Sequence, residues 1–302
     1  MPRIDSHAQV FAKESAEFPR ECSDLIPADR EALVETLLGE MEAHQIDQAV
    51  LVQAGGARIE HHAYLLHCLA LYPQRFRGIG LIPDGIDRPD EHMDRLADGT
   101  GIIGFRLNSI GGPTDPFSPI DVRTFRAYPI WKHAATRDYV LSLYVRAADA
   151  FQIPYMLEVF PQVRVVINHM GICPAEGHFS VDPGGRPRMD IPSTGVATHA
   201  THRLMGYENV LMQMSRQYAF SDEPYPYKET GIICWTLAKI FPPDRLLWAS
   251  DFPWIIDDPS YGPMMNIINE VIPNMGETAK AQLMGDNAAQ RLGFPPVESD
   301  AG

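Results

Sequence analysis

Short apolar runs alternate along this chain with longer segments in which apolar residues recur every three or four positions. The runs Ala49–Val52 and Val163–Ile167 are apolar at nearly every position, a pattern typical of strands that are covered on both faces. The same pattern predicts eight strands: Arg3–Val10, Gln48–Gln53, Phe76–Ile82, Ile102–Asn108, Tyr139–Val145, Val163–Met170, Asn209–Ser215 and Arg245–Asp251.

Helical periodicity fills the segments between these strands. Leu33, Leu37 and Met41 lie on one helix face, and a second helix ends before Tyr72 and Pro73. Eight alternations of strand and helix favour an α/β fold, a distorted (β/α)8 TIM barrel in a single domain. A doubly wound open sheet is the alternative, but it would need a phosphate-binding glycine fingerprint after an early strand, and the sequence has none. Further helices are expected at Phe151–Phe160 and Thr230–Ile240.

The barrel is expected to span residues 1–294, with a frayed tail at 295–302. The long irregular segment Gly171–Gly195 contains five glycines and four prolines. It follows the sixth predicted strand, on the face where barrels place their active sites, so we interpret it as a lid or specificity loop. The alternative is a solvated insertion without a role.

The net charge of the chain limits the classes of molecule that it is expected to bind. The net charge is −14, which argues against binding to nucleic acid or to anionic membranes. An anionic small-molecule substrate would have to be held by local arginines. Scattered cysteines, no apolar targeting segment and no run of about 18 apolar residues indicate a cytoplasmic protein. Association into homo-oligomers stays open.

Polar side chains stand where the predicted strands end. In a parallel barrel these ends converge on one mouth, so residues far apart in the sequence are expected to share one site. Asp251 follows a buried strand and lies between aromatic residues in Trp248–Trp254. A carboxylate in such surroundings does little for solubility and indicates a catalytic role. The other candidates are His7, Gln9, Gln53, Arg106, Asn108, Tyr144, Arg146 and His169.

Four motifs in order along the chain resemble the amidohydrolase superfamily. They are Asp5–Phe11, Gly104–Asn108, Asn168–Gly171 and Ala249–Trp254, and Gly285–Ala288 is similar to the final-helix motif of that family. The resemblance covers residues 3–294. It is greatest to the branch that contains 2-pyrone-4,6-dicarboxylate lactonases and sugar-lactone hydrolases.

The resemblance implies catalytic roles for three residues. Asp251 would activate a water, and His169 would bind a metal or polarise the substrate carbonyl. His7 matches the first histidine of a His-x-His pair, but Gln9 replaces the second, and a carboxamide is a poor zinc ligand. Some members of this branch work without a metal, so we favour no cofactor, with Gln9 and the imidazoles as donors to the carbonyl oxygen. The alternative is one divalent metal, zinc or manganese, on His7, His169 and Asp251.

Arginines would hold the carboxylate of the substrate. Arg106 is the best candidate because a guanidinium forms two parallel hydrogen bonds with a carboxylate. Arg146, Arg203 and Arg216 are further candidates, and each has the alternative role of a surface charge or an ion pair in the barrel wall. Trp254 and Tyr144 either line the pocket or pack beneath the loops.

Other histidines and methionines are expected to have structural roles. His61, His62 and His67 lie on a helical pattern and are expected to face solvent. His199 and His202 lack further zinc ligands, and Met212 and Met214 fit barrel packing.

Three functional hypotheses follow. The leading one is a hydrolase that opens a carboxylated lactone or a similar cyclic ester with water activated by Asp251. The second is a zinc-dependent decarboxylase or amide hydrolase of the same superfamily. The third is a barrel that binds a ligand without catalysis.

Overall fold

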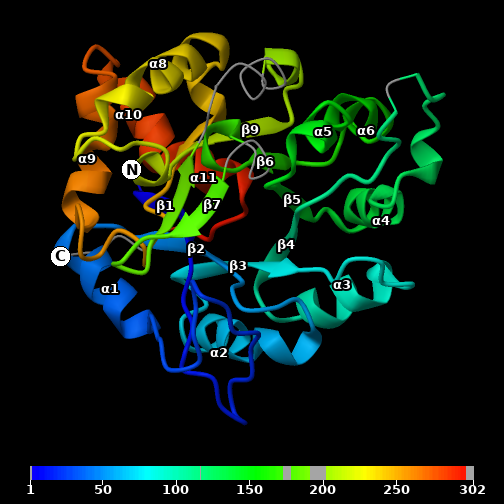
Figure 1. Ribbon diagram of the computed structural model, residues 1–302, viewed down its shortest axis with the longest axis horizontal. Helices are drawn as coiled ribbons and strands as arrows, with labels where there is room; N and C mark the ends of the chain where they lie inside the picture. Colours follow the sequence, from blue (N-terminus) through cyan, green and yellow to red (C-terminus); the bar gives the residue numbers. More distant parts are fainter. Residues whose placement is uncertain (1, 116, 173–177, 191–201, 297–302) are drawn as a thin grey trace.

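The computed structural model describes residues 2–115, 117–172, 178–190 and 202–296. Eight parallel strands form one sheet in which sequence neighbours pair in order (Figure 1). The predicted (β/α)8 barrel is therefore confirmed. The strands are β1 (Ile4–Ala8), β2 (Gln48–Val52), β3 (Phe76–Leu81), β4 (Ile102–Leu107), β5 (Val140–Leu143), β6 (Val165–Ile167), β9 (Val210–Met214) and β10 (Leu246–Trp248).

The barrel closes between its first and last strands through residues of the candidate site. The Asp251 amide donates to the His7 carbonyl at 3.1 Å, and the Gln9 amide donates to the Phe252 carbonyl at 2.8 Å. Two register shifts, one between Asp5 and Ala8 and one between Gly78 and Ile79, distort the barrel.

Helices surround the sheet on its outer face (Figure 1). The end opposite the carboxyl ends of the strands is plugged by Ala288 and Leu292, which pack with one or more apolar residues from each strand. None of the described helices is both long and apolar enough to cross a bilayer. The helices are α1 (Val34–Ala43), α2 (Ala63–Leu71), α3 (Pro89–Ala97), α4 (Tyr128–Arg137), α5 (Ala147–Ala150), α6 (Ile153–Val159), α8 (Gly231–Ile240), α9 (Tyr261–Val271), α10 (Glu277–Ala281) and α11 (Asn287–Arg291).

Several strands end earlier than the apolar pattern predicts. β6 stops at Ile167 and β10 stops at Trp248, and the residues that follow turn sharply. His169, Arg216 and Asp251 have positive φ angles of 50°, 67° and 63°. Non-glycine residues adopt this region at a cost of about 1–3 kcal/mol each, and such strain clusters at functional sites. Hydrophobicity alone could not reveal these turns.

The segment Gly171–Gly195 is not irregular throughout, as the sequence suggested. Within it β7 (His178–Val181) and β8 (Pro187–Asp190) form an antiparallel hairpin. Arg186 bonds Asp258, and Arg188 bonds the Tyr218 carbonyl, so the hairpin is fixed to loops at the carboxyl ends of the strands. Residues 173–177 and 191–195, and His199, lie outside the described part of the chain.

The expectation that His61 and His62 face solvent is wrong, whereas His67 is exposed. His62 is fully buried, where its Nδ1 donates to the Arg58 carbonyl at 2.8 Å and its Nε2 accepts from the Leu81 amide at 2.9 Å. Burial lowers the pKa of His62 to about 4. This neutral imidazole holds the end of β3 in place.

Acid should therefore weaken the fold through His62. The folded protein binds this proton more weakly than the unfolded chain, so the contribution of neutral His62 is complete above pH 6.5 and is lost as the pH falls toward 4. Relative to His62→Gln, we expect the wild type to lose at most about 3 kcal/mol across this range. Urea unfolding at a series of pH values measures the difference, with His67→Gln as an exposed control. A difference that does not change with pH would contradict this role.

Candidate active site

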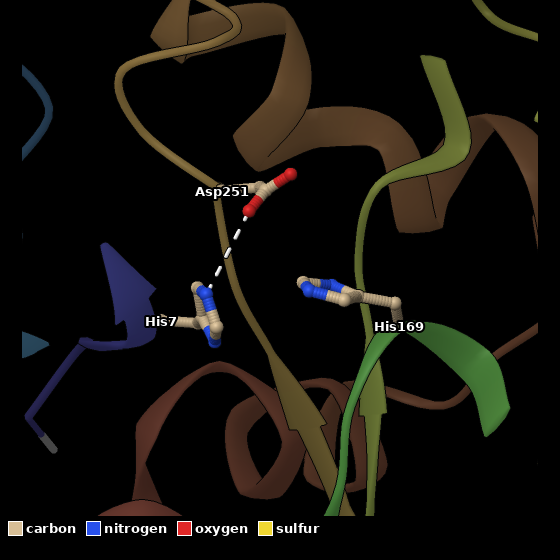
Figure 2. A group of neighbouring side chains, drawn as sticks. All are labelled: His7, His169 and Asp251. Atoms are coloured by element: carbon tan, nitrogen blue, oxygen red, sulfur yellow. Dashed lines mark ion pairs between the residues drawn. The ribbon is translucent and has the colours of Figure 1, made fainter. Parts of the chain in front are cut away.

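His7, His169 and Asp251 meet above the plugged end of the barrel (Figure 2). One nitrogen or oxygen atom from each lies within 4.8 Å of the others, and all three residues are fully buried. The His7 and His169 rings stand edge to face with centroids 4.8 Å apart, and His7 Nε2 lies 3.7 Å from Asp251 Oδ1. Residues that are 82 to 244 positions apart in the sequence thus share one centre.

Both imidazoles are neutral. Burial, reinforced by Arg106 and Arg216, lowers the pKa of His7 well below its ordinary value. Burial and then Arg216 do the same to the pKa of His169. Within the described residues, both ring nitrogens of His7 and Nε2 of His169 are buried without a hydrogen-bond partner. His7 Nε2 points toward Asp251, so both rings bring an unpartnered nitrogen to the cluster, where a ligand would satisfy it.

A buried ion pair holds Asp251 in place. Arg216 Nε donates to Oδ2 at 2.7 Å and Nη2 donates to Oδ1 at 3.1 Å, while the Tyr218 hydroxyl donates to Oδ2 at 2.6 Å. Burial opposes the charge of Arg216, but the Asp251 carboxylate, together with Tyr144 and Tyr218, outweighs burial and raises the pKa of the guanidinium. Oδ2 accepts two short bonds, whereas Oδ1 accepts one and faces His7. Oδ1 is therefore the carboxylate oxygen with more unused hydrogen-bonding capacity.

Arg106 is a cation beside the cluster that has unused donors. Its Nε and Nη1 are buried and have no hydrogen-bond partner in the described structure. Burial and the neighbouring Arg216 lower the pKa of Arg106 to about 10, so it stays charged at neutral pH. The Tyr144 ring lies between the two guanidinium groups, with Cζ–centroid distances of 5.7 Å to Arg106 and 5.4 Å to Arg216. Arg106 therefore has donors available for an anion beside the buried cluster.

Asp5 positions two of the site residues, a role that sequence reasoning missed. Its Oδ1 accepts from the backbone amides of Ser250 at 3.0 Å and His7 at 3.2 Å. Its Oδ2 accepts from the hydroxyls of Ser250 and Tyr261. Burial, opposed by these bonds, raises the pKa of Asp5 to about 6. One carboxylate thus ties the strand that carries His7 to the turn that carries Asp251.

A polar layer lies below the imidazoles and fixes His169. Its Nδ1 is 2.9 Å from Ser215 Oγ, which is 3.4 Å from Gln213 Oε1. Gln213 Oε1 already accepts from Asn168, so it is an acceptor for the Ser215 hydroxyl. We therefore assign the His169 proton to Nδ1, which leaves a lone pair on Nε2 facing the centre. Ordinary strand propensities gave no sign of this layer.

The remaining predicted residues lie around this centre in different roles. Gln9 Oε1 accepts from the buried Trp254 indole at 3.1 Å, and Gln53 Nε2 donates to backbone carbonyls that include His61 at 2.8 Å. Asn108 is exposed and lines a cavity beside Arg106.

Two of the arginines lie near the surface. Arg146 is half exposed and pairs with Asp149 at 3.1 Å, and Arg203 is exposed. Neither is placed among the buried residues of the cluster. Met212 and Met214 are buried between the sheet and the outer helices.

The donor set also fits one divalent metal in number and spacing. Two imidazoles and one carboxylate within 4.8 Å match the three protein ligands of catalytic zinc sites. The proton on His169 Nδ1, directed at Ser215, leaves Nε2 free as a ligand, as the outer partners of metal-bound histidines do. The bond between Asp251 and Arg216 works against this, because a guanidinium already neutralises the carboxylate.

A protein-family model described as amidohydrolase matches residues 4–294. No curated protein sequence gives a significant match.

Solved structures share the fold at low sequence identity. One is a probable 2-pyrone-4,6-dicarboxylic acid hydrolase from Acinetobacter baumannii with citric acid bound: TM-score 0.73, 19% identity, covering 97% of this chain and 100% of that chain. Another is an amidohydrolase from Burkholderia multivorans with bound zinc: TM-score 0.73, 20% identity, covering 98% and 100%. A 2,6-dihydroxybenzoate decarboxylase from Rhizobium has TM-score 0.60 and 17% identity, covering 97% and 99%.

Removal of the Asp5 carboxylate should destabilise the protein. Asp5→Ala leaves two buried backbone amides without an acceptor, and we expect the free energy of unfolding to fall by about 2–4 kcal/mol. Urea unfolding at pH 7 measures the loss. Asp24→Ala, at an exposed carboxylate, is the matched control and should leave stability unchanged. Equal stability of the two variants would rule out the role of Asp5.

Proposed function

The chain belongs to the amidohydrolase family, and we propose that it hydrolyses a carboxylated lactone or a similar cyclic ester. The observation that supports this proposal is the convergence of two neutral imidazoles that keep unpartnered nitrogens, one carboxylate and one guanidinium with free donors. The name of the A. baumannii protein is in keeping with it, because a pyrone dicarboxylate is a carboxylated cyclic ester.

Arg106 binds the carboxylate of the substrate. A substrate carboxylate that accepts from the unpartnered Nε and Nη1 would satisfy two buried donors at once. Such charge-assisted pairs are stronger than neutral hydrogen bonds and fix orientation. The ester carbonyl is then directed toward the two imidazoles, whose pKa values Arg106 already influences.

Asp251 and His169 activate the water. A water placed between Asp251 Oδ1 and His169 Nε2 donates one hydrogen bond to each, because both atoms have free lone pairs in the assigned tautomer. Oδ1 takes one proton while the water oxygen attacks the carbonyl carbon. General-base assistance of this kind contributes about 10²–10⁴-fold to the rate.

His7 stabilises the negative charge that develops on the carbonyl oxygen. As a neutral imidazole with no other partner, it donates its N–H to this oxygen. One such donor is worth about 3 kcal/mol in the transition state. When the tetrahedral intermediate collapses, the ring C–O bond breaks and the leaving oxygen takes the proton held by Asp251. The product is an open hydroxy acid, and the carboxylate is regenerated.

A metal-dependent reaction is the second candidate, favoured by the spacing of the His–His–Asp cluster. His7, His169 and Asp251 would hold the ion. When bound, zinc supplies Lewis-acid polarisation of the carbonyl and a lower pKa for water. The decarboxylase from Rhizobium shows that this fold also hosts a different reaction.

Asp251→Asn should abolish hydrolysis. We expect kcat on 2-pyrone-4,6-dicarboxylate or another carboxylated lactone to fall at least about 100-fold, because asparagine cannot accept the proton. The buried Arg216 loses its counter-charge, so thermal unfolding must be followed in parallel. Tyr218→Phe is the control: it removes one hydrogen bond from Oδ2 and leaves Oδ1 and Arg216 in place, so most activity should remain. A folded Asp251→Asn variant with the wild-type rate would refute the mechanism.

The metal content of active protein separates the two candidates. We expect hydrolysis to continue after prolonged dialysis against a chelator, with zinc and manganese far below one ion per chain by elemental analysis. The Arg216–Asp251 pair should substitute for the charge that a metal would supply. Activity that disappears on dialysis and returns with zinc would establish the metal-dependent reaction instead.

A further inference from the structure

A cavity of about 340 Å³ lies beside the buried cluster. It lies between the carboxyl ends of β3 and β4 and the starts of α3 and α4, and we call it the β3–β4 pocket. Its volume is within the range of small-molecule sites. The catalytic histidines and Asp251 do not line it, so it is a compartment next to the reaction centre.

Arg106 belongs to both compartments. It lines the β3–β4 pocket, and its guanidinium also lies near Tyr144, whose ring contacts the His169 ring. Tyr144 connects the two sides, since its ring is 4.9 Å from that of His169 and 5.7 Å from the Arg106 guanidinium carbon. A molecule whose carboxylate is bound by Arg106 can therefore extend in one direction toward the imidazoles and in the other into the pocket.

Apolar side chains form much of the pocket lining. Leu81, Ile82, Ile86 and Ile130 line it and are half-buried, so a ligand would cover the apolar surface that they leave open. Burial of such surface contributes roughly 25 cal/mol per Å². The hydroxyls of a polyhydroxylated ligand that lie against these four side chains would lose water without gaining partners from them, which is unfavourable.

Polar side chains also line the pocket. Asp84, Asn108 and Arg126 are exposed. Arg126 Nη2 donates to Ser109 Oγ at 3.1 Å, and its side chain lies against Gly111, where an added Cβ would come within 2.6 Å of Arg126 Nε. Gly111 also has a φ of 73°, so glycine is needed there. Polar and apolar side chains thus share the lining of the pocket.

We propose that the β3–β4 pocket takes an aryl or alkyl group attached to the carboxylated substrate. This inference rests on the proposed function and names its substrate class: lactones with an apolar body are accepted, and polyhydroxylated sugar lactones are not. Arg106 selects the charge, and Ile82, Ile86 and Ile130 select the apolar body.

Binding of two inert carboxylates of similar size tests the pocket separately from the reaction. By titration calorimetry on the full chain, 3-phenylpropanoate should bind at least about 10-fold more tightly than gluconate. Ile130→Asn should weaken 3-phenylpropanoate about 10-fold and leave gluconate unchanged. Ile232→Asn, at an exposed helical isoleucine on α8, is the matched control and should change neither.

Three results would overturn the inference: no binding of 3-phenylpropanoate, equal or tighter binding of gluconate, or an Ile130→Asn variant that binds 3-phenylpropanoate as the wild type does. Arg106→Gln should weaken both ligands together. Because no bond is broken in these experiments, failure to hydrolyse lactones would reject the proposed reaction without affecting the preference of the pocket.

Discussion

The candidate site depends on the buried ion pair between Arg216 and Asp251. Two charges at the mouth of a barrel would be costly without mutual compensation, and the two hydrogen bonds between them provide it. The pair also affects the protonation of the neighbouring histidines and the orientation of the carboxylate. The Arg216 charge helps keep His169 and His7 neutral, and the geometry leaves Oδ1 of Asp251 as the oxygen that faces them.

The backbone around this pair adopts unfavourable conformations that position the side chains of the site. His169, Arg216 and Asp251 all have left-handed backbone conformations just beyond β6, β9 and β10. Asp5 secures the His7 strand to the Asp251 turn, and the layer of Gln213 and Ser215 secures His169 from below. These buried hydrogen bonds stabilise the three strained turns. They account for the polar groups that lie inside an otherwise apolar barrel.

The sequence indicated the barrel and the residues that meet at its mouth, because strand ends converge whatever the details of packing. His7, His169 and Asp251 could be placed together on that basis. The roles of Asp5, Gln213 and Ser215 could not, since they act through partners that only the folded chain brings near. His62 shows the same limit: a histidine in a helical pattern gives no sign that its two nitrogens will be used by Arg58 and Leu81. The hairpin of β7 and β8 was hidden by its glycines and prolines.

A crystal structure with a slowly hydrolysed carboxylated lactone or its open hydroxy acid tests the central claim most directly. The account predicts the carboxylate within about 3 Å of Arg106 Nε or Nη1, with the former carbonyl carbon between His7, His169 and Asp251 Oδ1. A ligand bound at another place, with Arg106 beyond hydrogen-bond reach of its carboxylate, would contradict it.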